Sequence, residues 1–574
     1  MAKKILIVGG VAGGATAAAR LRRLDEEAQI ILFERGEYIS YANCGLPYYI
    51  GGVIEDRDAL LVQTVEGMSI RFNLDIRPLN EVIKIDKQIK KVQVKNLETG
   101  EVYEESYDYL ILSPGANPIK PPIPGIGESG NLFTLRNIPD TDAIKAFVDH
   151  KNPQKALVVG GGFIGLEMTE NLHDRGIEVT VVEMLDQVMA PVDYEMACIV
   201  HNHLREKGIK LILADGVREF RNQGKMAVLQ SGRELETDMI ILSIGVKPEN
   251  ELAKEAGLTI GQRGGIVVNE YLQTDDEGIY ALGDAIEVKD FINGQPTMIP
   301  LAWPANRQGR IVADNIYGKK VKYPGSMGTS VAKVFDLTVA TTGNNEKTLK
   351  RLGIEHRVIH IHPGSHAGYY PGAAPIALKI AFDPNNGKIF GAQAIGMDGV
   401  EKRIDVIATA IKGSLSVFDL QNLELAYAPP YSSAKDPVNM AGYVASNIID
   451  ESTDTIQWYE IDQLIENREI VLDVREPIER RSGFINGSIN IPLGQLRERL
   501  HELPLDKTIN IYCQVGLRGY LASRILTLNG IANKNLDGGF KTYSIVFGNN
   551  NNQKCKVEVD DAGVAHFNCY GDKK

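Results

Sequence analysis

The stretch KALVVGGGFIG, residues 155–165, decides the fold of this 574-residue chain. A short apolar run ends on three consecutive glycines and is followed by a helical pattern that begins near Gly165. A second apolar run then ends on Glu183, 18 residues after Gly165. Strand, glycine turn, helix, strand and acid in this order are typical of the βαβ unit that binds a dinucleotide.

The same pattern occurs near the N-terminus, in KILIVGGVAGG at residues 4–14. Val11 stands where the fingerprint has its middle glycine, so this loop is a less complete match. Glu34, 20 residues after Gly14, supplies the acid that the pattern requires. The two copies start 151 residues apart, which is too long a period for a solenoid and predicts two separate nucleotide-binding domains.

The composition is that of an ordinary globular protein, with 44% hydrophobic and 24% charged residues. The net charge of −12 and a pI near 5.5 argue against nucleic acid or an anionic membrane as a partner. No window is apolar for the roughly 18 residues that a membrane span needs, and glycines and arginines interrupt the apolar N-terminus. Five scattered cysteines predict no disulfide framework and favour a cytoplasmic location.

The second glycine loop favours NADH as its ligand. Its glycines let backbone N–H groups approach a pyrophosphate at a helix N-terminus. Glu183 is placed to accept a hydrogen bond from a ribose 2′-hydroxyl and to repel a 2′-phosphate. The alternative is a glycine-rich turn that binds no ligand.

Two further segments, Ser113–Ala116 and Ala281–Asp284, each follow a strand and support a flavin site in the first domain. In the second of them, a strand end delivers Asp284 to hydrogen-bond a ribityl hydroxyl. These motifs resemble the two-dinucleotide-binding-domain flavoprotein reductases, the glutathione-reductase-like superfamily. The resemblance implies FAD in the first domain and NADH in the second. The residues predicted to bind them are Gly9, Gly10, Val11, Ala12, Gly13, Gly14, Glu34, Arg35, Asn43, Ser113, Pro114, Gly115, Gly160, Gly162, Gly165, Glu183, Gly283, Asp284 and Ala302.

One cysteine, Cys44, lies in the segment SYANCGLP at residues 40–47. Many members of the superfamily carry two cysteines five positions apart, but position 49 here is Tyr49, so no internal dithiol forms. A lone cysteine accepts electrons as a sulfenic acid, or as a mixed disulfide or persulfide with a small thiol. Cys44 is therefore the predicted catalytic residue, and a buried inert cysteine is the alternative.

Four segments narrow the resemblance: residues 16–23, 40–47, 369–372 and 427–431 closely resemble coenzyme A-disulfide reductases and their persulfide-reductase relatives. The match covers about residues 1–447 and implies a homodimer in which Tyr369 and Tyr427 are active-site tyrosines supplied by the partner subunit. It also implies coenzyme A contacts from Thr16, Arg20, Arg23, Ser40, Asn43, Arg71 and Lys435. The cations among them suit an ADP 3′-phosphate and pyrophosphate. Without the resemblance, Arg20 and Arg23 indicate a solvated helix face, and the tyrosines indicate ordinary packing.

The C-terminal part contains a second reactive cysteine. A strand at residues 509–512 opens onto the loop Cys513–Arg518, just before a helical pattern. Together with IVLDVRE at residues 470–476, this resembles a rhodanese domain over about 90 residues. Backbone N–H groups at a helix N-terminus and a nearby Arg518 stabilise a thiolate or persulfide at Cys513. A phosphate-binding loop and an inactive relic are the alternatives; Gly519 stands where phosphatase loops carry Ser or Thr.

These features predict an α/β protein with two Rossmann-like FAD/NAD(P)-binding domains, an α+β dimerisation domain and a C-terminal rhodanese-like α/β domain. The predicted boundaries are 1–149 with 256–324 for FAD, 150–255 for NADH, 325–447 for dimerisation, 448–456 for a linker, 457–547 for the rhodanese domain and 548–574 for a tail. Cys198 is expected to pack inside a helix. Cys555 and Cys569 receive no role because His566 alone does not complete a metal site, and no metal is expected.

The predicted activity is NADH-dependent reduction of coenzyme A persulfide, polysulfide or coenzyme A disulfide through Cys44. Cys513 is expected to supply or accept sulfane sulfur. Two rivals remain from the residues: an NADH oxidase or peroxidase that uses Cys44 as a sulfenic acid, and a redox-sensing sulfur-carrier protein.

Overall fold

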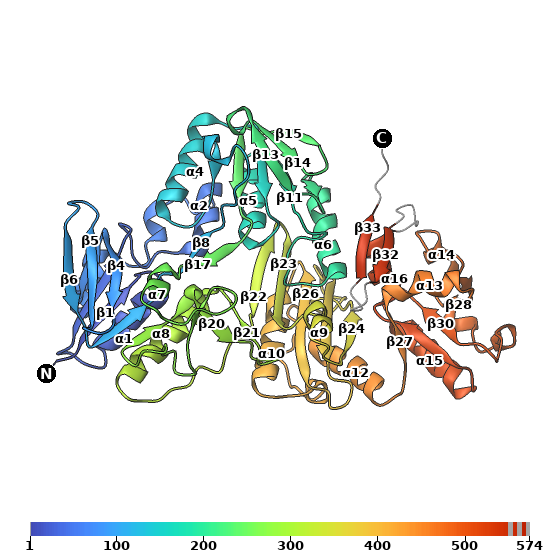
Figure 1. Ribbon diagram of the computed structural model, residues 1–574. Helices are drawn as coiled ribbons and strands as arrows, with labels where there is room; N and C mark the ends of the chain where they lie inside the picture. Colours follow the sequence, from blue (N-terminus) through green and yellow to red (C-terminus); the bar gives the residue numbers. More distant parts are fainter. Residues whose placement is uncertain (1, 549–554, 560–564, 570–574) are drawn as a thin grey trace. The chain divides into compact units, whose positions relative to one another are not determined.

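The computed structural model describes residues 2–548 together with two strands at 555–559 and 565–569. The chain forms two compact units, each assembled from two segments of the sequence (Figure 1). The first unit contains Met1–Leu185 and Ile209–Gly328, and the second contains Asp186–Gly208 and Thr329–Lys574. Residues 186–208, which interrupt the first unit in sequence, therefore pack with the second.

Two parallel five-stranded sheets form the centre of the first unit. One has the order β19-β7-β1-β2-β3, and the other has the order β12-β11-β10-β16-β9. The first sheet contains β1 (Lys4–Val8), β2 (Gln29–Glu34), β3 (Asp75–Pro78), β7 (Tyr109–Leu112) and β19 (Ile279–Ala281). The second contains β9 (Leu132–Phe133), β10 (Lys155–Val159), β11 (Glu178–Val182), β12 (Lys210–Ile212) and β16 (Met239–Leu242). When the second order is taken in reverse, β16-β10-β11-β12 corresponds to β7-β1-β2-β3 of the first sheet. This shared order confirms the internal repeat predicted from the two glycine loops.

A helix follows the glycine loop in each repeat and packs directly on it. In α1 (Gly13–Arg22), a Cβ on Gly14 would lie 1.9 Å from the carbonyl oxygen of Gly9. In α5 (Phe163–Asp174), a Cβ on Gly165 would lie 2.0 Å from the carbonyl oxygen of Gly160. Only glycine permits this approach, which brings each helix N-terminus to the carboxyl end of the first strand.

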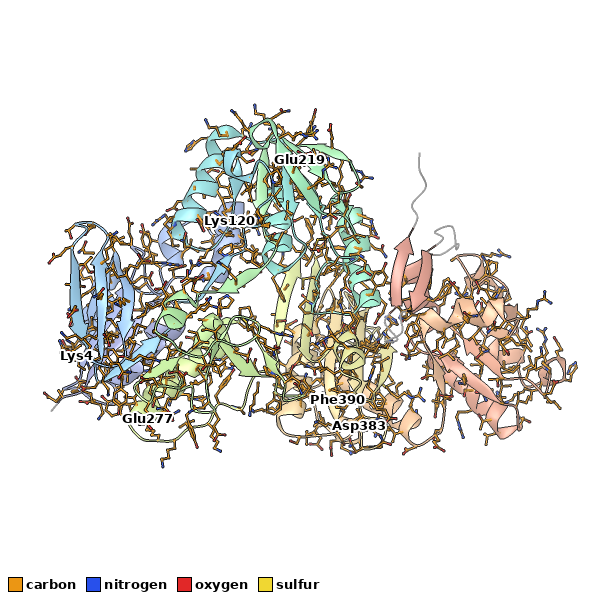
Figure 2. The ribbon with its side chains drawn as sticks, viewed as in Figure 1. Lys4, Lys120, Glu219, Glu277, Asp383 and Phe390 are labelled. Carbon is orange, nitrogen blue, oxygen red and sulfur yellow. The ribbon has the colours of Figure 1, made fainter. Side chains whose placement is uncertain are left out.

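Smaller elements complete the first unit. The antiparallel sheets β4-β5-β6 and β13-β14-β15 belong to the first and second repeat respectively. Their strands are β4 (Asn80–Asp86), β5 (Lys91–Asn96), β6 (Val102–Ser106), β13 (Val217–Arg221), β14 (Met226–Leu229) and β15 (Glu234–Glu236). Lys4, labelled in Figure 2, begins β1 and pairs with Glu105 of β6 at 2.5 Å. Helix α8 (Ala302–Ile316) packs closely on α1, since a Cβ on Gly309 would lie 2.4 Å from the carbonyl oxygen of Gly13.

An antiparallel five-stranded sheet of order β22-β23-β26-β25-β24 forms the first half of the second unit. Its strands are β22 (Ser330–Val334), β23 (Leu337–Gly343), β24 (Arg357–Ile361), β25 (Ile376–Phe382) and β26 (Ile389–Gly396). Every residue of β25 and β26 is buried, which explains their nearly continuous apolar sequence. Helices α10 (Val400–Lys412) and α12 (Pro437–Ile449) contact this sheet, and α6 (Tyr194–Glu206) contacts β26.

A parallel sheet of order β27-β31-β30-β28-β29 forms the second half of this unit. Its strands are β27 (Thr455–Ile456), β28 (Ile470–Asp473), β29 (Ile489–Asn490), β30 (Ile509–Tyr512) and β31 (Asn533–Leu536). The helices used below are α14 (Pro477–Arg480), α15 (Leu517–Leu528) and α16 (Gly539–Phe547). Cys198 of α6 is buried in the same apolar cluster as Trp458 and Phe540, in agreement with its expected packing.

The residues predicted as a linker are largely held in place. The predicted range 448–456 overlaps the end of α12 at Ile449 and the start of β27 at Thr455. Between them, Thr453 contacts Ser523 through their hydroxyl oxygens at 3.2 Å, and the carbonyl of Asp454 accepts the N–H of Asn535 at 2.9 Å.

The predicted tail contains two paired strands, β32 (Cys555–Val559) and β33 (Ala565–Cys569). They run antiparallel, with Cys555 opposite Cys569, and no sequence signal singled out this hairpin. The remainder of the predicted tail, 549–554, 560–564 and 570–574, lies outside the described residues, as do the side chains of Cys555, His566 and Cys569.

We predict that Gly14→Ala destabilises the first unit by about 1–3 kcal/mol, because the added methyl group forces α1 away from the glycine loop. Urea unfolding of the full chain measures this change. Gly127→Ala is the matched control, since a Cβ there meets nothing within 4 Å, and it should change the free energy of unfolding by about 0.5 kcal/mol or less. Equal stability of the two variants would contradict the packing described here.

Candidate functional site

A cavity of about 820 Å³ opens at the carboxyl ends of β1, β2 and β7 in the first unit. Ligands of parallel α/β sheets bind at this edge, and the volume lies in the range of small-molecule sites. Most of the residues predicted to bind the first dinucleotide line it: Gly9, Val11, Ala12, Gly13, Glu34, Arg35, Asn43, Ser113, Pro114, Gly115, Gly283 and Asp284. Gly10 and Gly14 do not line it, and Ala302 starts the helix whose Ala305 does.

The acid that ends each repeat binds its own glycine loop. Glu34 accepts N–H hydrogen bonds from Gly10 and Gly36, both at 2.9 Å. Glu183 accepts them from Gly161 at 2.7 Å and from Leu185 at 2.9 Å. The two carboxylates are therefore held beside the loops in the same way, at the strand end where the dinucleotide fingerprint has its acid.

Charged residues form the polar wall of the cavity. Arg35 pairs with Glu249, and Arg136 contacts the same carboxylate at 3.2 Å. Burial raises the pKa of Asp284, and the positive charge of Arg136 opposes that rise. Asp284 is thus a half-buried carboxyl group that favours a hydroxyl partner.

The second glycine loop is open where its ligand is expected. A Cβ on Gly162, the residue before α5, would meet no atom within 4 Å. Gly160 has φ of +108° and supports the tight turn at the end of β10. Beside Glu183, Met184 and Leu185 are exposed. The loop therefore has room for a phosphate at the N-terminus of α5.

Cys44 lies where the two repeats meet. It is the middle residue of the short helix Asn43–Gly45, which leads into α2 (Leu46–Gly51), and α2 packs on α5 of the second repeat. The packing is close, because a Cβ on Gly51 would lie 2.0 Å from Oδ1 of Asn171 in α5. Cys44 itself is exposed. The backbone that leads to Cys44 is strained at Ser40, whose φ of +45° lies in the left-handed region.

Two carboxylates influence the Cys44 thiol. Desolvation by the surrounding protein, followed by the charges of Glu167 and Asp284, raises the pKa of Cys44. Burial and the neighbouring Glu170 raise the pKa of Glu167 to about 7. Glu167 therefore titrates near neutral pH, and its negative form opposes the thiolate. Sequence inspection missed Glu167, which lies on α5 and is separated from Cys44 by more than a hundred residues.

The residues predicted to bind coenzyme A differ in availability. Thr16 donates to Asn306 at 2.5 Å, and Arg20 is paired with Asp314 at 2.7 Å. The guanidinium of Arg23 lies over the ring of Phe72, 6.0 Å from its centroid, and Arg71 precedes Phe72 in the sequence. Arg23 and Arg71 are both exposed. Lys435 belongs to the second unit, where it is exposed near Tyr443.

Two tyrosine-bearing loops meet in the second unit. The hydroxyl oxygens of Tyr369 and Tyr427 lie 2.8 Å apart, and both rings are exposed. Arg403, which is 1% exposed, ties the loops together because its guanidinium donates to the carbonyl of Ser365 at 2.8 Å and to Asp436 at 3.0 Å. A fully buried arginine at this position was not predicted, although its place in an apolar helical pattern was the available signal.

The Cys513 loop forms between β30 and α15. Cys513 is buried, and its Sγ accepts the N–H of Gly516 at 3.1 Å. Arg518 donates twice to Glu479 of α14, at 2.6 and 2.7 Å, so its charge is already paired. The buried Arg475 holds the loop side chain of Gln514 at 3.0 Å.

Comparison with known proteins gives this arrangement a family. Residues 3–309 match the pyridine nucleotide-disulphide oxidoreductases. The chain belongs to this family. Residues 329–437 match the family's dimerisation domain, and residues 458–545 match the rhodanese-like domain.

Individual relatives span most of the chain. It is 38% identical to a coenzyme A disulfide reductase of Staphylococcus haemolyticus (strain JCSC1435) over 78% of this chain and 100% of that protein. The protein in a crystal structure of reduced Bacillus anthracis CoADR-RHD is 62% identical in sequence to this chain, with a TM-score of 0.95. The match covers 95% of this chain and 98% of that one. The structure of a NAD-dependent persulfide reductase from A. fulgidus has 39% sequence identity and a TM-score of 0.88. The match covers 94% of this chain and 100% of that one.

These matches confirm the predicted fold class and the resemblance drawn from the motifs. The chain is an oxidoreductase. Within the described residues, every helix is too short or too polar to cross a membrane.

We predict that Glu167→Gln lowers the pKa of Cys44 in this oxidoreductase, because it removes a negative charge that opposes the thiolate. Above about pH 7, where Glu167 is ionised in the unaltered protein, iodoacetamide should alkylate Cys44 on the order of three- to tenfold faster in the variant. Below that pH the two rates should converge. Peptide mass spectrometry follows the reaction, with the exposed Glu128→Gln as control; equal rates at every pH would show that Glu167 does not act on Cys44.

Proposed function

We propose that this oxidoreductase uses NADH to reduce coenzyme A persulfide, polysulfide or coenzyme A disulfide through Cys44. We further propose that Cys513 carries sulfane sulfur to or from that reaction. One observation carries the proposal: Cys44 stands alone, without a second cysteine, where the loop of the first repeat packs on the helix of the second. A thiol at that junction lies next to the site of one dinucleotide and the helix that binds the other.

The residues present suit both cofactors. The cavity of about 820 Å³ offers open space at Gly115, where a Cβ would meet nothing within 4 Å, and a polar wall that includes Asp284. The open loop at Gly162 and the carboxylate of Glu183 suit NADH. Bound FAD supplies two-electron transfer between NADH and a disulfide at Cys44.

Cys44 performs the sulfur chemistry. Its thiolate attacks the S–S bond of the substrate, forms a new bond to one sulfur and expels the other as sulfide or thiolate. Two electrons and a proton then break the new bond, which restores the Cys44 thiol and releases the second product. Because Tyr49 replaces the second cysteine of a dithiol pair, the bond formed at Cys44 has to be one with the small thiol.

Arg23 and Arg71 are the cations that best suit the phosphates of coenzyme A, since neither has a carboxylate partner among the ion pairs of the described residues. Arg20 is already paired with Asp314, so it binds a phosphate only as part of a network. Thr16, Ser40, Asn43 and Lys435 complete the proposed set.

Two exposed tyrosines in the dimerisation domain favour a homodimer. Tyr369 and Tyr427 present a hydrogen-bonded hydroxyl pair to solvent in one chain, which suits delivery to the active site of a partner subunit. The free thiols that the chemistry needs suit a reducing compartment such as the cytoplasm.

An NADH oxidase or peroxidase remains the rival within the same fold. It would use Cys44 as a sulfenic acid and would have no need of a sulfurtransferase loop. The buried Cys513, with its Sγ hydrogen-bonded to the Gly516 amide, therefore favours sulfur as the substrate.

We expect kcat/KM for NADH to exceed that for NADPH by at least about tenfold, which corresponds to about 1.4 kcal/mol. The reason is that Glu183 repels a 2′-phosphate at the ribose position. Steady-state oxidation of each nucleotide measures the ratio of the two kcat/KM values, and Glu183→Gln should bring this ratio closer to one. Equal use of the two nucleotides by the unaltered enzyme would remove Glu183 from the site.

Replacing the two cysteines should separate the two halves of the proposed function. Cys44→Ser should abolish NADH-dependent reduction of every disulfide or persulfide while FAD binding and flavin reduction by NADH persist. Cys513→Ser should leave coenzyme A disulfide turnover intact and abolish sulfur transfer from thiosulfate. Absorbance of NADH and of the flavin follows the reduction, and thiocyanate formed from thiosulfate and cyanide follows the sulfur transfer. Normal coenzyme A persulfide turnover in Cys44→Ser would refute the mechanism.

A further inference from the structure

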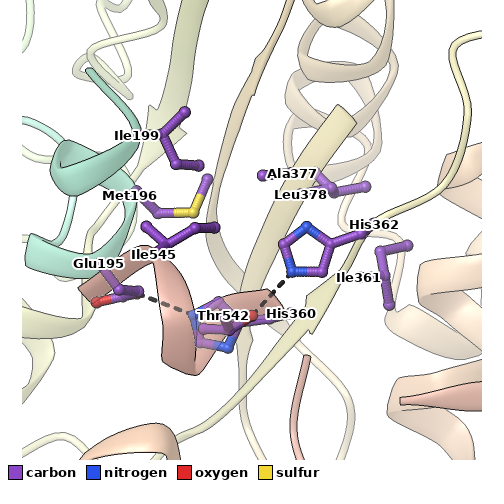
Figure 3. A pocket seen from close by; sticks show the side chains of 10 residues that line it. All are labelled: Glu195, Met196, Ile199, His360, Ile361, His362, Ala377, Leu378, Thr542 and Ile545. Atoms are coloured by element: carbon purple, nitrogen blue, oxygen red, sulfur yellow. Dashed lines mark hydrogen bonds and ion pairs between the residues drawn. The ribbon is translucent and has the colours of Figure 1, made fainter. Parts of the chain in front are cut away.

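His360, on β24, is buried between α6 and the segment that contains Asp537. Figure 3 shows it beside Glu195 of α6. Its Nδ1 lies 2.6 Å from Oδ2 of Asp537, and its Nε2 lies 2.9 Å from Oε1 of Glu195 on α6. Its backbone N–H also donates to Oδ1 of Asp537 at 2.9 Å. Because a carboxylate faces each ring nitrogen, both nitrogens donate and the ring is an imidazolium.

The imidazolium belongs to a larger group of buried charges. Nζ of Lys379 on β25 lies 2.6 Å from Glu195, 2.5 Å from Glu346 and 3.0 Å from Asp193. These three carboxylates lie close enough together to hold a metal ion, but the lysine ammonium already contacts each of them. Burial acts to lower the pKa of His360, whereas the charge of Asp537 and hydrogen bonds from Asp537 and Glu195 raise it to about 9. The imidazolium is therefore the form present at neutral pH.

Asp537 leads directly into a corner made of two glycines. Gly538 and Gly539 have φ of +67° and +64°, so both lie in the left-handed region that glycine favours. A Cβ on Gly538 would lie 2.8 Å from the Cβ of His360. The histidine therefore abuts one side of this corner.

The opposite side of the corner supports the Cys513 loop. A Cβ on Gly539 would lie 2.6 Å from the carbonyl oxygen of Cys513. The next two N–H groups, at the start of α16, donate to the same loop: Phe540 to the carbonyl of Cys513 at 2.7 Å, and Lys541 to that of Gln514 at 2.9 Å. Three residues, 537–539, thus connect His360 to the backbone that carries the reactive sulfur.

We infer that His360 is a positioning residue for sulfur transfer at Cys513. By binding Asp537, it fixes the Gly538–Gly539 corner against the loop, so that the Gly516 amide stays directed at the sulfur. His360 does not touch the reacting atoms and lies on a strand of the dimerisation-domain sheet, outside the sequence matched by the rhodanese-like domain. This inference rests on the proposed role of Cys513.

The neighbouring His362 provides a way to separate two roles of His360: positioning of the Cys513 loop, and attachment of one domain to the other. Nε2 of His362 lies 2.8 Å from Oγ1 of Thr542 on α16, beside the small cavity of about 10 Å³ drawn in Figure 3. It fastens the same two domains, but no hydrogen bond among those of the described residues joins it to Asp537. If only docking mattered, His362→Gln would impair Cys513 as strongly as His360→Gln; positioning predicts a clearly smaller effect.

The test uses the full-length holoenzyme. In the sulfur-transfer assay, Cys513 takes the outer sulfur of thiosulfate, releases sulfite and passes the sulfur to cyanide as thiocyanate. His360→Gln should lower kcat of this reaction on the order of 10- to 100-fold, with a smaller change in KM, because the loop is displaced while thiosulfate access is kept. The rate of Cys513 alkylation at a fixed pH should also change, since the sulfur loses the directed Gly516 amide. NADH-dependent disulfide reduction at Cys44 should change less than twofold.

His356→Gln is the matched control, because this half-buried histidine contacts only the carbonyl of Ile354 among the hydrogen bonds of the described residues. Asp537→Asn should reproduce the His360→Gln phenotype, and it carries the test if the histidine variant does not fold. A folded His360→Gln or Asp537→Asn protein with unaltered kcat and an unaltered rate of Cys513 alkylation would overturn the inference. Sulfur transfer that survives in Cys513→Ser would instead overturn the proposed function.

Discussion

The nucleotide-binding unit depends on a helix packed against a backbone carbonyl with no side chain between them. The contact occurs twice, at Gly14 over Gly9 and at Gly165 over Gly160. It brings the helix N-terminus to the end of the first strand, so free amides and the positive end of the helix dipole point at the space where a phosphate binds. The acid at the end of the second strand, Glu34 or Glu183, then reaches the loop amides.

The position of Cys44 follows from the same contacts. Since the loop helices of both repeats are fixed on their strands, α2 can pack on α5, and Cys44, in the short helix Asn43–Gly45 that leads into α2, comes to lie between the repeats. Desolvation and the negative charges of Glu167 and Asp284 raise the pKa of the resting Cys44 thiol. Reactivity at neutral pH therefore depends on the charge state of Glu167 and on the cations that a bound substrate and cofactor bring with them.

The second unit is organised by buried charges instead of glycine contacts. Arg403, Lys379 and His360 are each almost fully buried, and each is surrounded by carboxylates or carbonyl groups from distant parts of the chain. An unpaired charge at such depth is strongly destabilising, so each cation enforces the relative position of the segments that supply its partners. In this way Arg403 joins the two tyrosine loops, and His360 joins the antiparallel sheet to the corner beneath Cys513.

Local patterns in the sequence predicted the fold well. The glycine spacing, the acids Glu34 and Glu183, and the loop that starts at Cys513 are each read within about thirty residues, and the structure places them in strand–turn–helix units as expected. Pairings between distant residues were not predictable. Arg20 is paired with Asp314, 294 positions away, and Arg518 with Glu479, and no local pattern in the sequence identified either partner.

Some of the missed contacts did leave a trace in the sequence. Lys379 stands in the middle of the apolar run that became β25, and a lysine in a fully buried strand requires a counter-charge. The sequence does not identify which acids supply it, since Asp193 and Glu195, at the start of α6, precede Lys379 by more than 180 residues. The predicted linker, 448–456, includes the last two residues of α12 and both residues of β27.

Mass spectrometry of the native protein after incubation with coenzyme A disulfide tests the central claim most directly. The account predicts one reductant-sensitive coenzyme A adduct per chain, located on the peptide that contains Cys44 and absent from Cys44→Ser. An unmodified Cys44, or an adduct found only on Cys198 or Cys513, would contradict it.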